Sequence, residues 1–193
     1  MKKRIGLTRI TLIGLTSFGL LFATAGISNA SANLFMKIDN LQGETQVQGR
    51  QNQIELNSFS LGISADSSFL KGSQAAVGKP SWGSVNISKD FDSVTPSTMQ
   101  NLIRGVSFKS IVIEATKSTG GAAPQTYLRY TFTDAFITGD SVNIDDSGAT
   151  NESLSFVYKT MKVEYFKQGI DGKLATQPIK FGWDIAQNKQ NDA

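Results

Sequence analysis

The chain has 193 residues, of which 39% are hydrophobic and 18% are charged, a composition typical of an ordinary globular domain. It contains no histidine and no cysteine. This excludes disulfides, thiol nucleophiles, zinc fingers and every catalytic triad that needs either residue, although an enzyme built on carboxylates, Lys, Tyr or Ser is still conceivable.

The first 32 residues have the three parts of a secretory signal peptide. "MKKRIGLTR" is basic, "ITLIGLTSFGLLFATAG" is apolar and uncharged, and "ISNASA" supplies small residues. We expect cleavage after Ala32, with Ala30 as the second choice, which leaves one domain over residues 33–193. The alternative is an uncleaved membrane anchor, for which the apolar run is slightly short.

Cleavage would change the charge of the protein. The formal net charge of the whole chain is +3, from 19 basic and 16 acidic residues. The signal segment holds four basic residues and no acidic one, so the remainder has 15 against 16 and a net charge of −1. We therefore expect a secreted or periplasmic protein with no nucleic-acid partner and, after cleavage, no membrane contact.

The elements after the signal are mostly predicted strands. "LFMKI" alternates as a strand does, and "NLQGE" follows as a turn. In "QIELNSFSLGI" the apolar parity slips at Asn57–Ser58, which predicts a β-bulge. Residues 65–81 are rich in Gly, Ser and Ala without a clean period, so we predict a long loop that serves as an interaction element.

One helix is predicted, at about residues 96–104. Thr95 is the expected N-cap, a proline follows at the first helical position, and Gly105 comes after the last turn. Met99, Leu102 and Ile103 have the spacing of one apolar stripe.

Further strands follow the helix, and together they predict the fold class. "WGSVNISK" precedes the helix, and "SIVIEAT", "TYLRYTFTDAFIT", "ESLSFVY", "TMKVEYF" and "PIKFGWDI" come after it. A second bulge is predicted near Lys159–Thr160, where the parity slips again. Many strands and one helix indicate a mainly β protein, a compact antiparallel β-barrel or sandwich with one flanking helix.

Two acidic residues near the first turn raise the question of a functional pair. Asp39 and Glu44 flank a glycine in an otherwise uncharged neighbourhood, so they could be a catalytic or metal-binding pair. No third carboxylate or titrating partner stands close by in the sequence. Turns favour polar residues because their backbone needs local hydrogen bonds, so we interpret both as residues of a strand end and its turn.

Two motif-like segments fail on their spacing. "GSQAAVGKP" resembles a P-loop, but five residues separate Gly72 and Gly78, and Lys79 is followed by proline instead of Ser or Thr. Ser68 and Lys71 form an S-x-x-K without the companion motifs of a serine acylase.

An acidic stretch, "GDSVNIDDSGATNE", holds Asp140, Asp145, Asp146 and Glu152. It does not fit the ligand positions of an EF-hand loop, and we interpret it as a solvated hairpin loop. We therefore predict no catalytic residue, no cofactor-binding residue, no metal ligand and no cofactor.

Four ordered blocks of the sequence resemble the Hcp family, the haemolysin-coregulated tube proteins of type VI secretion. They are "LFMKIDNLQGE", "IELNSFSLGI", "GKPSWGSVNISKDFDSVTPSTM" and "ESLSFVYKTMKVEY", and "GWDIAQNK" fits the family's closing strand. The resemblance implies a β-barrel with one flanking helix, hexameric rings that stack into a tube, ring interiors that hold small effectors, contact with the spike protein, and no catalysis.

The signal peptide departs from the family pattern, because tube proteins are generally assembled in the cytoplasm. Two hypotheses follow. The chain is either a structural ring or tube subunit associated with type VI secretion, or an exported monomeric β-barrel binding module that has lost the tube role. We favour a homohexameric ring in which residues 65–81, with Phe69, Leu70 and Val77, take part in contacts between subunits or rings, since apolar side chains gain most by burial.

Overall fold

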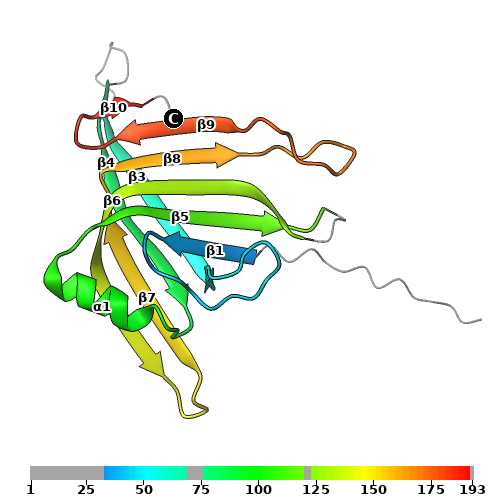
Figure 1. Cartoon of the computed structure of the whole chain (residues 1–193). Coiled ribbons are helices and arrows are strands. Elements are labelled where there is room, and N and C mark those ends of the chain that lie inside the picture. Colours follow the sequence, from blue (N-terminus) through cyan, green and yellow to red (C-terminus); the bar gives the residue numbers. More distant parts are fainter. Residues whose placement is uncertain (1–32, 69–75, 120–122, 192–193) are drawn as a thin grey trace, which may run out of the picture.

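The computed structural model describes residues 33–68, 76–119 and 123–191 (Figure 1). The expected signal peptide and both cleavage sites lie outside these residues. In this described part, ten strands and one helix follow in the order β1 (Asn33–Ile38), β2 (Ile54–Leu56), β3 (Ser58–Ser68), β4 (Ala76–Lys89), α1 (Thr95–Arg104), β5 (Phe108–Lys117), β6 (Gln125–Ile144), β7 (Thr150–Val157), β8 (Thr160–Tyr165), β9 (Ile179–Asp184) and β10 (Lys189–Gln190).

The antiparallel strand pairings form a closed circuit. β1 pairs with β2 and β5, β5 with β6, β6 with β7, β7 with β4, and β4 with β3. Only Asn57 separates β2 from β3, and its backbone N–H donates to the carbonyl of Ser88 at 2.8 Å. The parity slip at Asn57–Ser58 is a corner at which one continuous segment changes partners from β1 to β4, instead of the predicted β-bulge within one strand.

β6 is the longest strand and joins the two halves of the sheet. Its first half pairs with β5 and β8, and its second half pairs with β7. β7 and β8 pair one after the other with the same edge of β6, and Tyr158 and Lys159 separate the two strands. The parity slip near Lys159–Thr160 therefore marks a break between two strands, and the predicted bulge is wrong, because Thr133 opposite Thr160 and Phe136 opposite Val157 leave two residues between the pairs on each side. β9 and β10 extend the sheet beyond β8 (Figure 1).

Inward-facing side chains of the strands form one apolar core. Phe132 and Phe156 meet edge to face at 5.3 Å between ring centroids, and Tyr158 packs on Phe132 at 4.7 Å. Each large apolar side chain contributes about 1.5–3 kcal/mol when fully buried. The core also contains Met36, Ile38, Ile54, Leu56, Val85, Ile87, Ile111, Ile113, Leu154 and Met161.

The helix begins and ends close to the predicted residues, but two details of the prediction are wrong. The N-cap is Val94, which makes no side-chain capping bond, while Thr95 lies in the first turn and is fully buried. Ile103 is 84% exposed, so the predicted stripe is wrong at that residue; Thr95 and Thr98 are the buried residues of α1, and Leu102 packs against the core. Gly105 ends the helix with φ 63°, a conformation that glycine adopts without strain.

The long loop predicted over residues 65–81 is also wrong. β3 and β4 form a hairpin whose paired residues include Ala65 with Pro80 and Ser68 with Ala76. The described side chains at the outer end of this hairpin, from Ile63 to Asp66 and at Gly78 and Lys79, are exposed. A strand without a buried face needs no alternation of apolar residues, so the sequence pattern gave no signal there. Phe69 and Leu70 lie outside the described residues.

Candidate functional site

Asp39 and Glu44 do not form a pair. Asp39 accepts a hydrogen bond from the side chain of Asn40 at 3.1 Å, and Glu44 accepts one from the backbone N–H of Ser93 at 3.0 Å. The two carboxylates line different surface hollows. The glycine between them, Gly43, is required by packing, because a Cβ atom there would lie 2.3 Å from the carbonyl oxygen of Gln53.

The acidic stretch after β6 divides into two unlike parts, and the prediction of one solvated loop is wrong for half of it. Asp145 and Asp146 are exposed at the tip of the β6–β7 hairpin. Asp145 accepts hydrogen bonds from the hydroxyl of Ser147 at 2.6 Å and the backbone N–H of Ala149 at 3.0 Å, which close the turn. Glu152 is fully buried at the base of the hairpin, and both carboxylate oxygens of Asp140 are buried as well.

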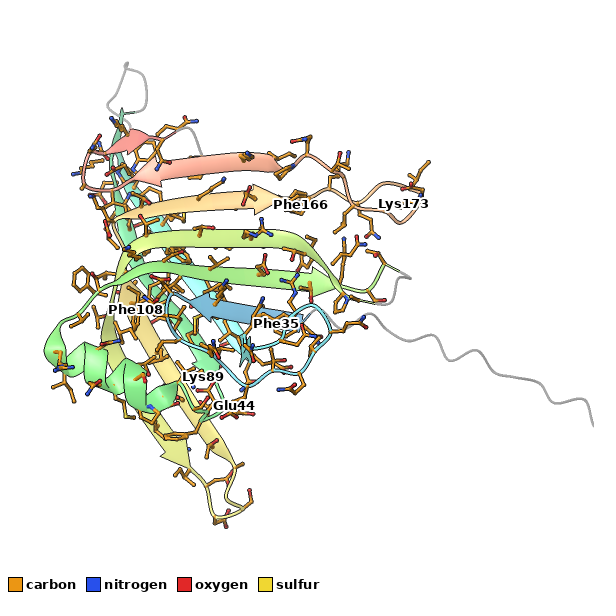
Figure 2. The ribbon with its side chains drawn as sticks, in the orientation of Figure 1. Phe35, Glu44, Lys89, Phe108, Phe166 and Lys173 are labelled. Carbon is orange, nitrogen blue, oxygen red and sulfur yellow. The ribbon has the colours of Figure 1, made fainter. Side chains whose placement is uncertain are left out.

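Lys89 lies at the centre of a buried polar cluster beside α1 (Figure 2). Its ammonium group is 2.7 Å from a carboxylate oxygen of Glu152 and 2.7 Å from one of Asp92. It also donates to the hydroxyl of Thr95 at 2.8 Å and to the carbonyl of Asp90 at 3.1 Å. These bonds tie the end of β4 to β7 and to the first turn of α1. We name Lys89, Asp92, Thr95, Asp140 and Glu152 the base cluster.

A second ionic network lies on the face of the β1–β5–β6–β8 sheet that points away from the apolar core, where it is partly covered. Glu114 pairs with Arg50 and, at 2.6 Å, with Arg129, and Arg129 also pairs with Glu164 at 3.4 Å. Burial by itself would lower the pKa of Arg129, but the hydrogen bond to Glu114 and the charges of Glu114 and Glu164 raise that pKa above its ordinary value. We name Arg50, Glu114, Arg129 and Glu164 the sheet-face network.

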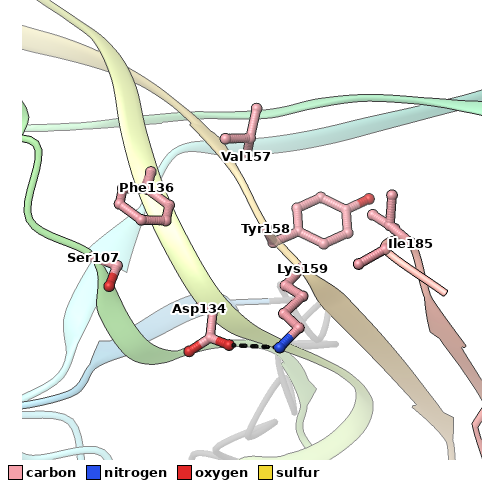
Figure 3. Close-up of a pocket in the computed structure, with 8 residues that line it drawn as sticks. Ser107, Asp134, Phe136, Val157, Tyr158, Lys159 and Ile185 are labelled. Atoms are coloured by element: carbon pink, nitrogen blue, oxygen red, sulfur yellow. Dashed lines mark ion pairs between the residues drawn. The ribbon is translucent and has the colours of Figure 1, made fainter.

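An apolar groove opens on the outer surface beside the β7–β8 interruption (Figure 3). It is a hollow of about 520 Å³, and Phe136 and Val157, which face each other across β6 and β7, are each 42% exposed there. Burial raises the pKa of Tyr158, which also lines the groove, to about 12, so its hydroxyl is neutral at physiological pH. The ion pair of Asp134 with Lys159, at 3.6 Å, lies at the rim.

A second apolar surface lies on β3, β8 and β9. Ile63 and Phe181 line one open hollow, and Tyr165 pairs with Ile179 on the same face of the sheet. All four side chains are at least 40% exposed. We name them the β8–β9 patch. Nearby, β3 pairs only with β4 among the described residues, so one edge of this 11-residue strand is open.

The remaining candidates carry no assembled chemistry. In the described ranges, no group of three acidic side chains is placed to hold a metal ion, and no helix is long and apolar enough to cross a membrane. Gly78 and Lys79 of the P-loop-like segment lie in β4, whereas Gly72 and Lys71 are outside the described residues. Sequence reasoning missed the base cluster because its members come from three separate segments of the chain, residues 89–95, β6 and β7.

Three comparisons with known proteins agree on one family. The family described as "Type VI secretion system effector, Hcp" matches residues 35–165. "Protein hcp1" of Pseudomonas aeruginosa is 26% identical over 163 residues, which cover 83% of this chain and 99% of the relative. The crystal structure of Hcp1 from Salmonella typhimurium is 26% identical, with a TM-score of 0.68, and covers 83% of this chain and 99% of that one. A further structure, titled as that of a type six secretion system protein, has a TM-score of 0.77 at 21% identity, with 83% and 100% covered.

Proposed function

Because this chain belongs to the Hcp family of type VI secretion, whose members are structural tube proteins that form hexameric rings, we propose that it assembles into a homohexameric ring of its own. The family is not a family of enzymes. The chain is accordingly a structural protein. Contacts with the spike protein and with small effectors in the ring interior are part of the proposal.

The presence of two separate apolar surfaces carries this proposal. A ring is built from head-to-tail contacts, so each subunit must offer two different surfaces that fit one another. The apolar groove on β6 and β7 and the β8–β9 patch are formed by different side chains and lie in different hollows. Burial of exposed apolar area contributes about 25 cal/mol per Å², which favours the covering of both surfaces.

The β3–β4 hairpin is proposed as a further contact between subunits or between rings. Its outer end extends beyond the part of β4 that pairs with β7, and its described side chains are exposed. An open edge of β3 offers backbone N–H and C=O groups to a neighbouring chain. Phe69 and Leu70, to which the sequence pointed, would add apolar area to this contact.

Export is proposed from the sequence alone. The basic, apolar and small-residue parts of residues 1–32 support cleavage after Ala32 or Ala30 and release into the periplasm or the medium. Intact mass of the protein recovered outside the cytoplasm is expected to show a chain that starts at Asn33 or Ser31. A full-length species held in the inner membrane would contradict this.

Light scattering of the exported protein tests the ring. We expect the mass of six subunits for the parent and a large loss of hexamer for the double variants Phe136→Ser, Val157→Ser and Ile179→Ser, Phe181→Ser. The matched control is Ile144→Ser, an exposed apolar residue of the β6–β7 hairpin outside both surfaces, which should stay hexameric. A monomeric parent would favour the second candidate, an exported β-barrel binding module without the tube role.

A further inference from the structure

The carboxyl group of Asp140 is buried without a partner. Neither of its oxygens has a hydrogen-bond donor within reach, and Oε1 of the fully buried Glu152 has none either. The large majority of buried side-chain polar atoms in folded proteins have a hydrogen-bond partner. Three orphan carboxylate oxygens at the base of one hairpin therefore need a physical explanation.

A β-bulge turns Asp140 toward the interior. Ile137 is opposite Phe156 and Gly139 is opposite Ser155, so Thr138 is an extra residue on β6. This shift in parity places Asp140 opposite Leu154, which is 2% exposed and belongs to the core. Glu152, two residues before Leu154 on β7, lies on the same face, within the diagonal reach of cross-strand neighbours.

No cation in the base cluster is free to neutralise Asp140. Lys89, from β4, has three N–H groups, and they already serve Glu152, Asp92, Thr95 and the carbonyl of Asp90. Asp92, on the β4–α1 connection, brings a further negative charge, and it accepts a bond from the backbone N–H of Val94 at 3.0 Å. The only charged side chain of α1 is Arg104, exposed in the last turn.

We propose that Asp140 is protonated in the folded protein and donates a hydrogen bond to Oε1 of Glu152, forming a proton-dependent latch that holds the β6–β7 hairpin to the base cluster. A proton on Asp140 supplies the donor that the oxygens of Asp140 and Oε1 of Glu152 lack. It adds no negative charge beside the ion pair of Lys89 and Glu152, whose two charges cancel. It also avoids a second uncompensated carboxylate at a buried position, which would carry a large desolvation cost.

The electrostatic setting of Asp140 is consistent with a held proton. Burial raises the pKa of the Asp140 carboxyl, the neighbouring charge of Glu152 raises it further, and Lys89 opposes both. A carboxyl whose pKa is higher in the folded than in the unfolded state contributes its full stability below about pH 4, the ordinary value. That contribution is lost as the pH rises through the folded pKa, so the latch is closed in acid and opens toward alkaline pH.

The test compares the parent with Asp140→Asn, which keeps the shape and stays neutral at every pH. Unfolding by urea is followed at pH values from about 4 to 9. At about pH 4 the two proteins should be equally stable, and the advantage of the Asn variant should grow with pH. Each unit by which the folded pKa of Asp140 exceeds 3.9 corresponds to a tenfold larger folded-to-unfolded ratio for the variant at high pH. A difference that does not change with pH would overturn the latch.

The matched control is Asp146→Asn, which removes the same charge from the exposed tip of the same hairpin. It should show no growing advantage with pH. Carboxyl ¹³C NMR of the parent provides a measurement that does not depend on any variant folding. The Asp140 signal should titrate above the ordinary aspartate value of about 3.9, and titration at or below that value would equally overturn the proposal.

Discussion

The base cluster and the sheet-face network use the same kinds of charged groups, but the first is fully buried at its centre and the second reaches solvent at Arg129. Lys89 and Glu152 have fully buried side chains, whereas the side chain of Arg129 in the sheet-face network is 35% exposed. Breaking a buried pair leaves a charge that water cannot reach, while an exposed pair exchanges its partner for water at little cost. The comparison shows that the loss in the free energy of unfolding when an ion pair is broken depends more on how deeply its charges are buried than on how many ion pairs are present.

The largest effect is expected at the centre of the base cluster. Lys89→Met keeps most of the side-chain volume but leaves Glu152 buried without its cation, so the free energy of unfolding should fall by about 3–5 kcal/mol. Urea denaturation measures it. The double variant Lys89→Met, Glu152→Met removes both charges and should recover much of this loss. If Lys89→Met alone lowered the free energy of unfolding by less than about 1 kcal/mol, the base cluster would be no more important for stability than an exposed ion pair, which would contradict the comparison.

An intermediate effect is expected at Glu114. It is the most buried member of the sheet-face network, and it pairs with two arginines. Glu114→Gln weakens the bonds to both Arg50 and Arg129, and hydrogen bonds to charged groups are worth about 1.5–3 kcal/mol. We expect a loss of about 1–2 kcal/mol in the same urea experiment. A loss as large as that of Lys89→Met would show that partial burial already suffices.

A smaller effect is expected at the exposed end of that network. Arg129→Met should lower the free energy of unfolding by less than about 1 kcal/mol, because Arg129 is 35% exposed and each of its partners keeps a second cation, Arg50 at Glu114 and Lys162 at Glu164. Raising the salt concentration to about 1 M shortens the Debye length to about 3 Å and should shrink this difference further. The loss in Lys89→Met should be insensitive to salt, which is the control.

The smallest effect is expected at Asp145, where exposure is complete. The hydrogen bond from the Ser147 hydroxyl and those from the backbone lower the pKa of Asp145. A lowered carboxyl pKa contributes stability above the unfolded value of about 3.9, and this is lost as the pH falls through the folded pKa. Asp145→Asn should therefore be slightly less stable than the parent at neutral pH and equal to it in strong acid. With rising pH the Asn variant should lose stability relative to the parent at Asp145 and gain it at Asp140. If both variants changed in the same direction, the prediction for Asp145 would be wrong.

Much of the fold follows from local sequence patterns. Strands with one buried face, such as β2 and β7, alternate buried and exposed residues, and the slips in apolar parity at Asn57 and near Lys159 mark two strand breaks in the structure. Pro96 and Gly105 bound the helix because their backbone restrictions are intrinsic to those residues. The family resemblance also rested on ordered sequence blocks, and the family match over residues 35–165 confirms it.

Other features were decided only by the tertiary structure. The outer β3–β4 hairpin is held by backbone pairing, and its described side chains, Ile63 to Asp66, Gly78 and Lys79, are exposed, so they show no burial period that a sequence could display. Asp140 turns inward because β6 bulges against a strand that follows it in the chain, and Glu152 is buried because Lys89, from β4, lies opposite it. Pairing between distant segments determines which polar groups leave water, and the cost of leaving water determines their chemistry.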